Sequence, residues 1–149
     1  MKKMKVSSID EEGDQMTLDA VIANPADPEE KWCEIKFLVD TGAGMTAITT
    51  SMAKALGLKY VATAEVGLAD GRIIKVNLAY AYLCIHGEGV FTIIGCGGCD
   101  VPLLGFDVLR LLQFQLDVAK KRVLRPARRR FKVLSNWIFG RGWSGAGLG

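Results

Sequence analysis

The feature that most constrains this chain is an apolar stretch with strand character that stops at a single carboxylate. The stretch covers residues 35–39 (IKFLV) and leads directly into residues 40–44 (DTGAG). A run of this kind is typical of a buried strand, and the small residues after it favour a tight turn. Asp40 is therefore expected at the edge of a core, where its surroundings can tune its pKa. An isolated Asp-Thr-Gly also opens ordinary turns and caps helices, so the rest of the chain has to decide between the two interpretations.

The remaining sequence alternates short β-prone runs with turn residues. Asp70-Gly71 predicts a tight hairpin, because this pair suits positive φ. Two short helices are predicted: residues 51–58, with Thr50 or Ser51 as N-cap, and residues 108–112, with Asp107 at the N-terminus. Strands are expected at residues 4–9, 16–22, 32–39, 46–49, 60–68, 73–78, 79–85, 90–94, 114–118 and 122–124. This pattern predicts a mostly β, closed or barrel-like fold with one or two short helices.

Length and composition agree with one globular domain. The chain has 149 residues, of which 50% are hydrophobic and 23% charged, enough to bury a core without disulfides or metals. No apolar run approaches the roughly 18–20 residues of a membrane span. The N-terminus is basic but has no apolar segment behind it, which argues against a secretory signal. We therefore expect a cytoplasmic protein with reduced cysteines.

Four features in a fixed order carry a resemblance to a known family. They are Asp40-Thr41-Gly42-Ala43, a short helix ending in Leu56-Gly57-Leu58, the Asp70-Gly71 hairpin, and Leu103-Leu104-Gly105-Phe106-Asp107 before a helix and a final strand pair. In this order the chain resembles the retropepsin-like single-domain aspartic proteases, which include retroviral proteases and small prokaryotic relatives. The resemblance covers residues 16–125 and implies a closed β-barrel of the acid-protease fold. Residues 1–15 would be an N-terminal extension.

The resemblance implies roles for residues at matching positions. Asp40 matches the catalytic aspartate, and Thr41 and Gly42 match the supports of the active-site loop. Gly42 and Ala43 would line the substrate channel. The tip of the flap that closes over a bound peptide would also contribute substrate contacts, from Leu68, Ala69 and Asp70. Leu104-Gly105 would pack behind the catalytic loop, which makes Asp107 structural rather than catalytic.

The chemistry of this family explains why one motif is not enough. Aspartic proteases activate a water between two carboxylates that share one proton, because two like charges so close together cannot both ionise. This chain has no second Asp-Thr-Gly or Asp-Ser-Gly. The expectation is a homodimer that contributes Asp40 twice, acts on a peptide or protein substrate and needs no cofactor and no metal.

The chain departs from its retroviral relatives in three places. Gly44 and Met45 stand where those relatives often carry acids, so the substrate subsites should differ. The predicted flap has two glycines, Gly67 and Gly71, which suggests a stiffer lid. In retroviral relatives the chain termini interleave to build the dimer. The extended N-terminus and basic C-terminus found here leave open how a dimer would form.

A Cys-x-x-Cys motif at Cys96 and Cys99 has three interpretations. It can hold structural thiols, a regulatory disulfide or half of a metal site. A zinc site needs about two more ligands, and only Cys33, Cys84 and His86 are available. No helix signal follows the motif as it does in redox proteins, because Asp100-Val101-Pro102 comes next. We favour structural thiols.

Charge divides the chain into an acidic body and a basic tail. Residues 1–119 hold all 16 acidic residues and 10 of the 19 Lys and Arg residues, whereas residues 120–149 hold the other nine basic residues and no acid. The basic segment 120–132 could make weak contact with an anionic membrane or nucleic acid. The alternative is a flexible tail at residues 126–149, which the glycine-rich end favours.

Three functions remain in competition. The leading one is an aspartic endopeptidase. The second is a non-catalytic or weakly catalytic dimeric module of the same fold that binds peptides as a scaffold. The third is a thiol sensor working through Cys96 and Cys99. The intact Asp40-Thr41-Gly42-Ala43 motif favours the endopeptidase, because a binding module has no need of the acid.

Overall fold

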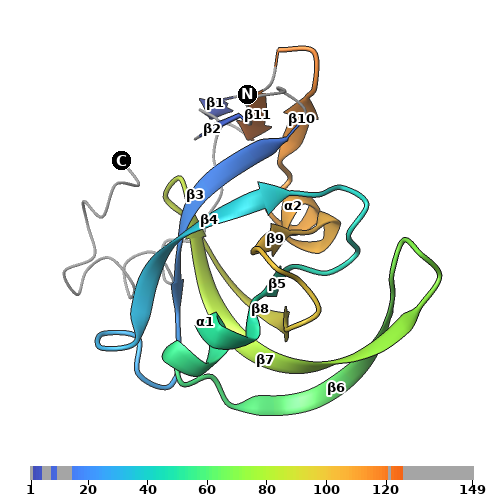
Figure 1. Ribbon diagram of the computed structural model, residues 1–149. Coiled ribbons are helices and arrows are strands. Elements are labelled where there is room, and N and C mark those ends of the chain that lie inside the picture. Colours follow the sequence, from blue (N-terminus) through green and yellow to red (C-terminus); the bar gives the residue numbers. More distant parts are fainter. Residues whose placement is uncertain (1, 5–7, 10–14, 121, 126–149) are drawn as a thin grey trace.

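A computed structural model of the protein describes residues 2–4, 8–9, 15–120 and 122–125 (Figure 1). Strands dominate the described residues, with two short helices between them. The elements are β1 (Lys2–Met4), β2 (Ser8–Ile9), β3 (Met16–Ala23), β4 (Trp32–Val39), β5 (Ala47–Ile48), α1 (Thr50–Ala55), β6 (Tyr60–Gly67), β7 (Ile73–Ile85), β8 (Glu88–Cys96), β9 (Leu103–Leu104), α2 (Phe106–Leu111), β10 (Gln115–Asp117) and β11 (Arg122–Arg125). The mostly β fold predicted from the sequence is confirmed.

The main sheet closes on itself. Its strand order is β2-β3-β4-β9-β5-β8-β7-β6, and β3 also pairs with β7. Within the described residues, β3, β4, β9, β5, β8 and β7 therefore form a ring, and β6 continues the sheet outside it. Closure gives the ring strands a neighbour on both sides and encloses a core. Large side chains that are fully buried in this core include Leu18, Phe37, Ile48, Leu83, Ile94 and Leu104.

The hairpin of β3 and β4 delivers the chain to Asp40. The two strands pair antiparallel from Thr17 opposite Leu38 to Ala23 opposite Trp32. The connecting loop is tied to the end of α1, because the side-chain amide of Asn24 donates to the carbonyl oxygens of Leu56 at 2.9 Å and Gly57 at 3.0 Å. The predicted strand pair leading to the Asp40 turn is thus confirmed.

Three local predictions were wrong. Instead of one strand at residues 4–9, the described residues there form β1 and β2, which belong to different sheets. Residues 73–78 and 79–85 form one continuous strand, β7, instead of two. The partner changes along this strand: β6 pairs with it as far as Ala79, and β3 takes over from Tyr82. The N-cap of α1 is Thr49, whose hydroxyl accepts the backbone N–H of Met52 at 3.2 Å. Thr50 and Ser51 already lie inside the helix.

A small second sheet joins the two ends of the described chain. Its order is β1-β11-β10, with both pairs antiparallel. The N-terminal extension thus places β1 beside β11 of the same chain, and it also adds β2 to the edge of β3. The predictions for residues 126–149 fall outside the described residues. In the described part of the chain, no helix has the length and apolar character that crossing a membrane requires.

Candidate active site

Asp40 lies where β4 ends, next to the short strand β9. The two strands pair in parallel, with Leu38 opposite Leu103 and Val39 opposite Leu104. The backbone N–H of Asp40 continues this ladder by donating to the carbonyl oxygen of Leu104 at 3.0 Å. Because Leu104 is fully buried, Asp40 is attached by its main chain to the core.

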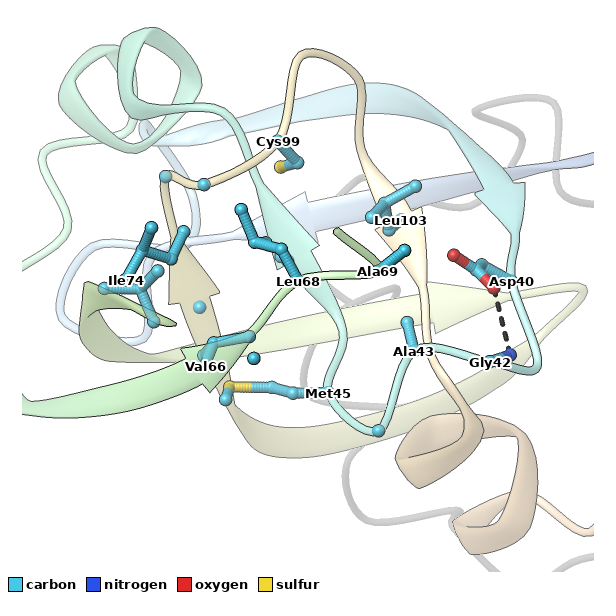
Figure 2. Close-up of a pocket in the computed structure, with 17 residues that line it drawn as sticks. Asp40, Gly42, Ala43, Met45, Val66, Leu68, Ala69, Ile74, Cys99 and Leu103 are labelled. Atoms are coloured by element: carbon cyan, nitrogen blue, oxygen red, sulfur yellow. Dashed lines mark hydrogen bonds between the residues drawn. The ribbon is translucent and has the colours of Figure 1, made fainter. Parts of the chain in front are cut away.

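A tight turn after Asp40 points its carboxylate back over the chain. The carbonyl oxygen of Asp40 accepts the N–H of Ala43 at 3.1 Å, and its carboxylate Oδ1 accepts the N–H of Gly42 at 2.9 Å (Figure 2). A side chain at Gly42 would place its Cβ 3.3 Å from that same oxygen. The glycine therefore allows the carboxylate to sit close to the main chain, while Asp40 remains partly exposed.

A hydrogen-bonded cluster around the buried Thr46 lies behind this loop. Thr46 is fully buried, and its hydroxyl donates to the Asp107 carboxylate at 2.8 Å while accepting the N–H of Gly105 at 2.9 Å. The N–H of Thr46 also donates to Asp107 at 3.0 Å. Asp107 in turn accepts the N–H of Val108 at 2.8 Å in the first turn of α2. Asp107 therefore joins the start of α2 to the loop after Asp40.

Gly105 allows the start of α2 to touch the loop that follows Asp40. A Cβ at this position would lie 2.6 Å from the carbonyl carbon of Met45 and 2.8 Å from the nitrogen of Thr46, closer than real contacts allow. The next residue, Phe106, donates its N–H to the carbonyl oxygen of Ala43 at 2.8 Å. The packing of Leu104-Gly105 behind the loop matches the sequence-based expectation. Thr46 was missed, because its partner lies 61 positions away.

The loop faces a cavity of about 350 Å³ whose other side is the β6–β7 hairpin (Figure 2). Its lining contains five of the predicted site residues: Asp40, Gly42, Ala43, Leu68 and Ala69. It also contains Met45, where a difference in the substrate subsites was expected, and four apolar side chains that the sequence did not assign to the site: Val66, Ile74, Val76 and Leu103. Successive side chains of a strand point to opposite faces, so every second residue along 60–68 and 73–78 could have been assigned to the cavity side of the hairpin.

The hairpin tip forms the turn that Asp70-Gly71 predicts. Gly71 has φ of 87° and donates its N–H to the carbonyl oxygen of Leu68 at 3.0 Å. Asp70 does not line the cavity, and its carboxylate instead pairs with the Nε of Arg72 at 2.6 Å in an exposed position. Figure 1 shows the hairpin as a long curved arm whose tip lies on the same side as the loop between β4 and β5.

Thr41 does not line the cavity but borders a second groove. This groove has a volume of about 520 Å³ and is lined by Thr41, Phe106, Leu109, Arg110, Gln113, Phe114, Gln115 and Leu116. Phe106 is 52% exposed, although it is a large apolar side chain. The turn at Asp40 thus borders both the cavity and this groove.

The four cysteines are free thiols. Cys99 lines the cavity and Cys96 is buried at the end of β8. Burial raises the pKa of the Cys96 thiol to about 11 and that of Cys84 to about 12, so both are protonated near neutral pH. Among the described residues, no group of three or more His, Cys, Asp and Glu side chains could hold a metal ion.

The part of the chain that contains this site matches a known protein family. Residues 31–111 match the family described as gag-polyprotein putative aspartyl protease. An uncharacterized protein of Rickettsia prowazekii is 31% identical over 90 residues, which are 56% of this chain and 39% of that protein. The chain therefore spans about two fifths of the length of this curated relative.

Two solved structures share the fold. EIAV protease in complex with an inhibitor is 20% identical with a TM-score of 0.56, over 73% of this chain and 98% of that one. A retropepsin-like aspartic protease from Rickettsia conorii is 25% identical with a TM-score of 0.53, over 83% of this chain and 94% of that one. The family match runs from just before β4 to the end of α2 and takes in Asp40, the hairpin and Gly105. The chain belongs to the gag-polyprotein putative aspartyl protease family and has the retropepsin-like fold.

Proposed function

We propose that the protein is an aspartic endopeptidase that hydrolyses peptide bonds with a water activated by two Asp40 carboxylates, one from each chain of a homodimer. The observation that carries this proposal is the place of Asp40, on a tight turn at the wall of a cavity that a hairpin covers. Asp40 is the single carboxylate in the described lining of that cavity. A reaction that needs two carboxylates therefore requires a second chain.

In the proposed reaction the two carboxylates share one proton. The ionised one takes a proton from the water as the water oxygen attacks the scissile carbonyl carbon, and the protonated one donates a hydrogen bond to the carbonyl oxygen. Collapse of the tetrahedral intermediate breaks the C–N bond as the amine nitrogen receives a proton. Such a pair titrates as a unit, so its apparent pKa values belong to both carboxylates together.

The cavity lining favours peptides with apolar side chains near the cleaved bond. Its wall combines apolar side chains from both sides, among them Met45, Val66 and Ile74, with glycines that leave space. Burying apolar side chains of a peptide there contributes about 25 cal/mol per Å² of surface removed from water. We propose that Gly42, Ala43, Leu68 and Ala69 also contact the substrate, because they line the same cavity.

The geometry also suggests which face meets the second chain. Two Asp40 carboxylates can share a proton only if the two-fold axis passes close to them. Thr41 is the next residue and is exposed, and it borders the groove that contains Phe106. A partner centred on the axis would cover this groove and bury Phe106.

The activity is tested by Asp40→Asn. Asparagine has nearly the same shape but cannot act as a general base, so cleavage of a peptide library should fall by about 10²-fold or more. The melting temperature should stay close to that of the wild type, because the amide oxygen can still accept the N–H of Gly42. Retained cleavage in this variant contradicts the proposal. Peptide binding by the wild type without any cleavage would instead favour the scaffold function.

The shared site is tested by mixing the wild-type protein with the Asp40→Asn variant at constant total protein concentration. Random pairing of equal amounts leaves about one quarter of the dimers with two Asp40 residues. Activity per total protein should therefore follow the square of the wild-type fraction. A linear decrease would mean that each chain acts alone.

The proposed dimer face is tested by Phe106→Ser. Removing this side chain should weaken self-association in sedimentation equilibrium, because the partner would no longer bury it. Phe91→Ser is the matched control, since Phe91 is 45% exposed on β8 and does not line the groove. Equal effects of the two substitutions would exclude this face.

A further inference from the structure

The Cys96–Cys99 segment forms part of the cavity wall. Cys96 is buried at the last position of β8, whereas Cys99 is partly exposed and lines the cavity. Figure 2 shows the Cys99 side chain on the loop that follows β8, among the residues around the cavity. One thiol of the pair therefore faces the site where a peptide would bind, and the other faces the core.

The two glycines between the cysteines bend this loop sharply. Gly97 has φ of 109° and Gly98 has φ of 74°, both in the region that side chains rarely adopt. The chain bends at both glycines, so the two cysteines stand at the two ends of one short bend. Burial raises the pKa of both the Cys96 and the Cys99 thiol. A disulfide between Cys96 and Cys99 would close a loop that contains only two glycines, the residue type that adapts most readily to a new backbone conformation.

The loop also touches the hairpin that covers the cavity. A Cβ at Gly98 would lie 2.8 Å from Cδ1 of Ile74 and 3.0 Å from Cγ1 of Val76. Both side chains belong to β7 and line the cavity. A change in the loop therefore has to move the start of β7, close to the hairpin tip, or leave a gap beneath it.

We propose that Cys96 and Cys99 form a reversible disulfide that changes the substrate cleft and lowers its affinity for peptides. The bond ties the cavity-facing sulfur of Cys99 to the buried sulfur of Cys96 and pulls the loop with it. The support that the loop gives to Ile74 and Val76 then shifts. The effect on peptides rests on the proposed protease function, whereas formation of the disulfide does not.

A small-molecule disulfide such as oxidised glutathione supplies the oxidation. The thiolate of Cys99 attacks one sulfur of oxidised glutathione, whose S–S bond breaks and releases one glutathione thiolate. The Cys96 thiol then loses its proton, and the resulting thiolate attacks the Cys99 sulfur and releases the second glutathione. The protein loses two protons and two electrons, and one oxidised glutathione becomes two reduced molecules. Cys99 reacts first because it faces the cavity and Cys96 is buried.

The test uses the full chain in buffers of increasing ratio of oxidised to reduced glutathione. Peptide mapping by mass spectrometry should find a disulfide linking Cys96 to Cys99, and dithiothreitol should reverse it. Oxidised protein should show a KM for peptide about threefold or more above the reduced value with little change in kcat, because Asp40 lies on a different loop. Amide hydrogen exchange in β7 should rise with the same dependence on the ratio.

Two variants make the test specific. Cys99→Ser should lose the response, while Cys33→Ser, a partly exposed thiol on β4 outside the cavity, should keep it. The peptide mass map and the amide hydrogen exchange do not depend on catalysis. If the protein cleaves no peptide, the protease function is rejected, while these two measurements still test the disulfide. Four free thiols at the highest ratio would overturn the proposal. So would a disulfide that leaves both KM and exchange in β7 unchanged.

Discussion

The loop that follows Asp40 (residues 40–46) and the hairpin tip (residues 68–72) both border one cavity, but different kinds of contact hold them in place. The loop segment around Thr46 is fixed by hydrogen bonds to Gly105 and Asp107, 59 and 61 positions away, and Thr46 is fully buried. The hairpin tip is held by bonds that stay within residues 68–72, and its Asp70–Arg72 pair is exposed. Long-range buried contacts restrain one side of the site, and short-range exposed contacts restrain the other.

The difference fits what each side has to do in the proposed reaction. A catalytic carboxylate must stay in place to within a fraction of an ångström, which needs a supporting layer of packed and hydrogen-bonded groups. A cover must open to admit a peptide and close again, so its contacts have to be weak and local. Substitutions on the loop side should therefore cost folding stability, whereas those at the hairpin tip should cost less.

The largest effect is expected from Gly105→Ala. The new methyl group would collide with the main chain at Met45 and Thr46, so the free energy of unfolding should fall by about 3 kcal/mol. Urea denaturation measures this. Gly44→Ala is the matched control on the same loop, because nothing lies within 4 Å of its Cβ position. A loss at Gly105 no larger than the loss at Gly44 would break the contrast between the two regions.

A smaller effect is expected from Asp107→Ala. The substitution removes the partly buried acceptor of the hydroxyl and N–H of the buried Thr46, which should cost about 2 kcal/mol. Asp107→Asn should recover part of this, because its amide oxygen can still accept one of these bonds. If the segment positions Asp40, kcat should fall while KM changes little. An alanine variant as stable and active as the wild type would show that the cluster is dispensable.

The smallest effect is expected at the hairpin tip. Gly71→Ala forces an alanine into a backbone with φ of 87°, at a cost of about 1 kcal/mol. Because the tip is exposed and locally bonded, much of this cost should appear as local opening, seen as faster amide exchange in residues 66–74. Gly67→Ala, with open space at its Cβ and no positive φ, is the control. A loss of global stability equal to that of Gly105→Ala would mean that the tip is part of the core.

Local features of the fold could be predicted because their causes are local. The strand before Asp40, the Asp70-Gly71 turn and the β3–β4 hairpin follow from side-chain alternation and turn chemistry over a few residues. The break predicted inside residues 73–85 was wrong, because a strand can change partners without ending.

By itself, the sequence determined the family and the strand that ends at Asp40, since each depends on residue types in a short order. Only the tertiary structure decided that Thr46 and Asp107 share hydrogen bonds, that Gly105 touches the loop at Met45, and that Cys99 lines the same cavity as Asp40. These contacts join residues about 60 positions apart. No local pattern encodes them, because closure of the barrel brings them together.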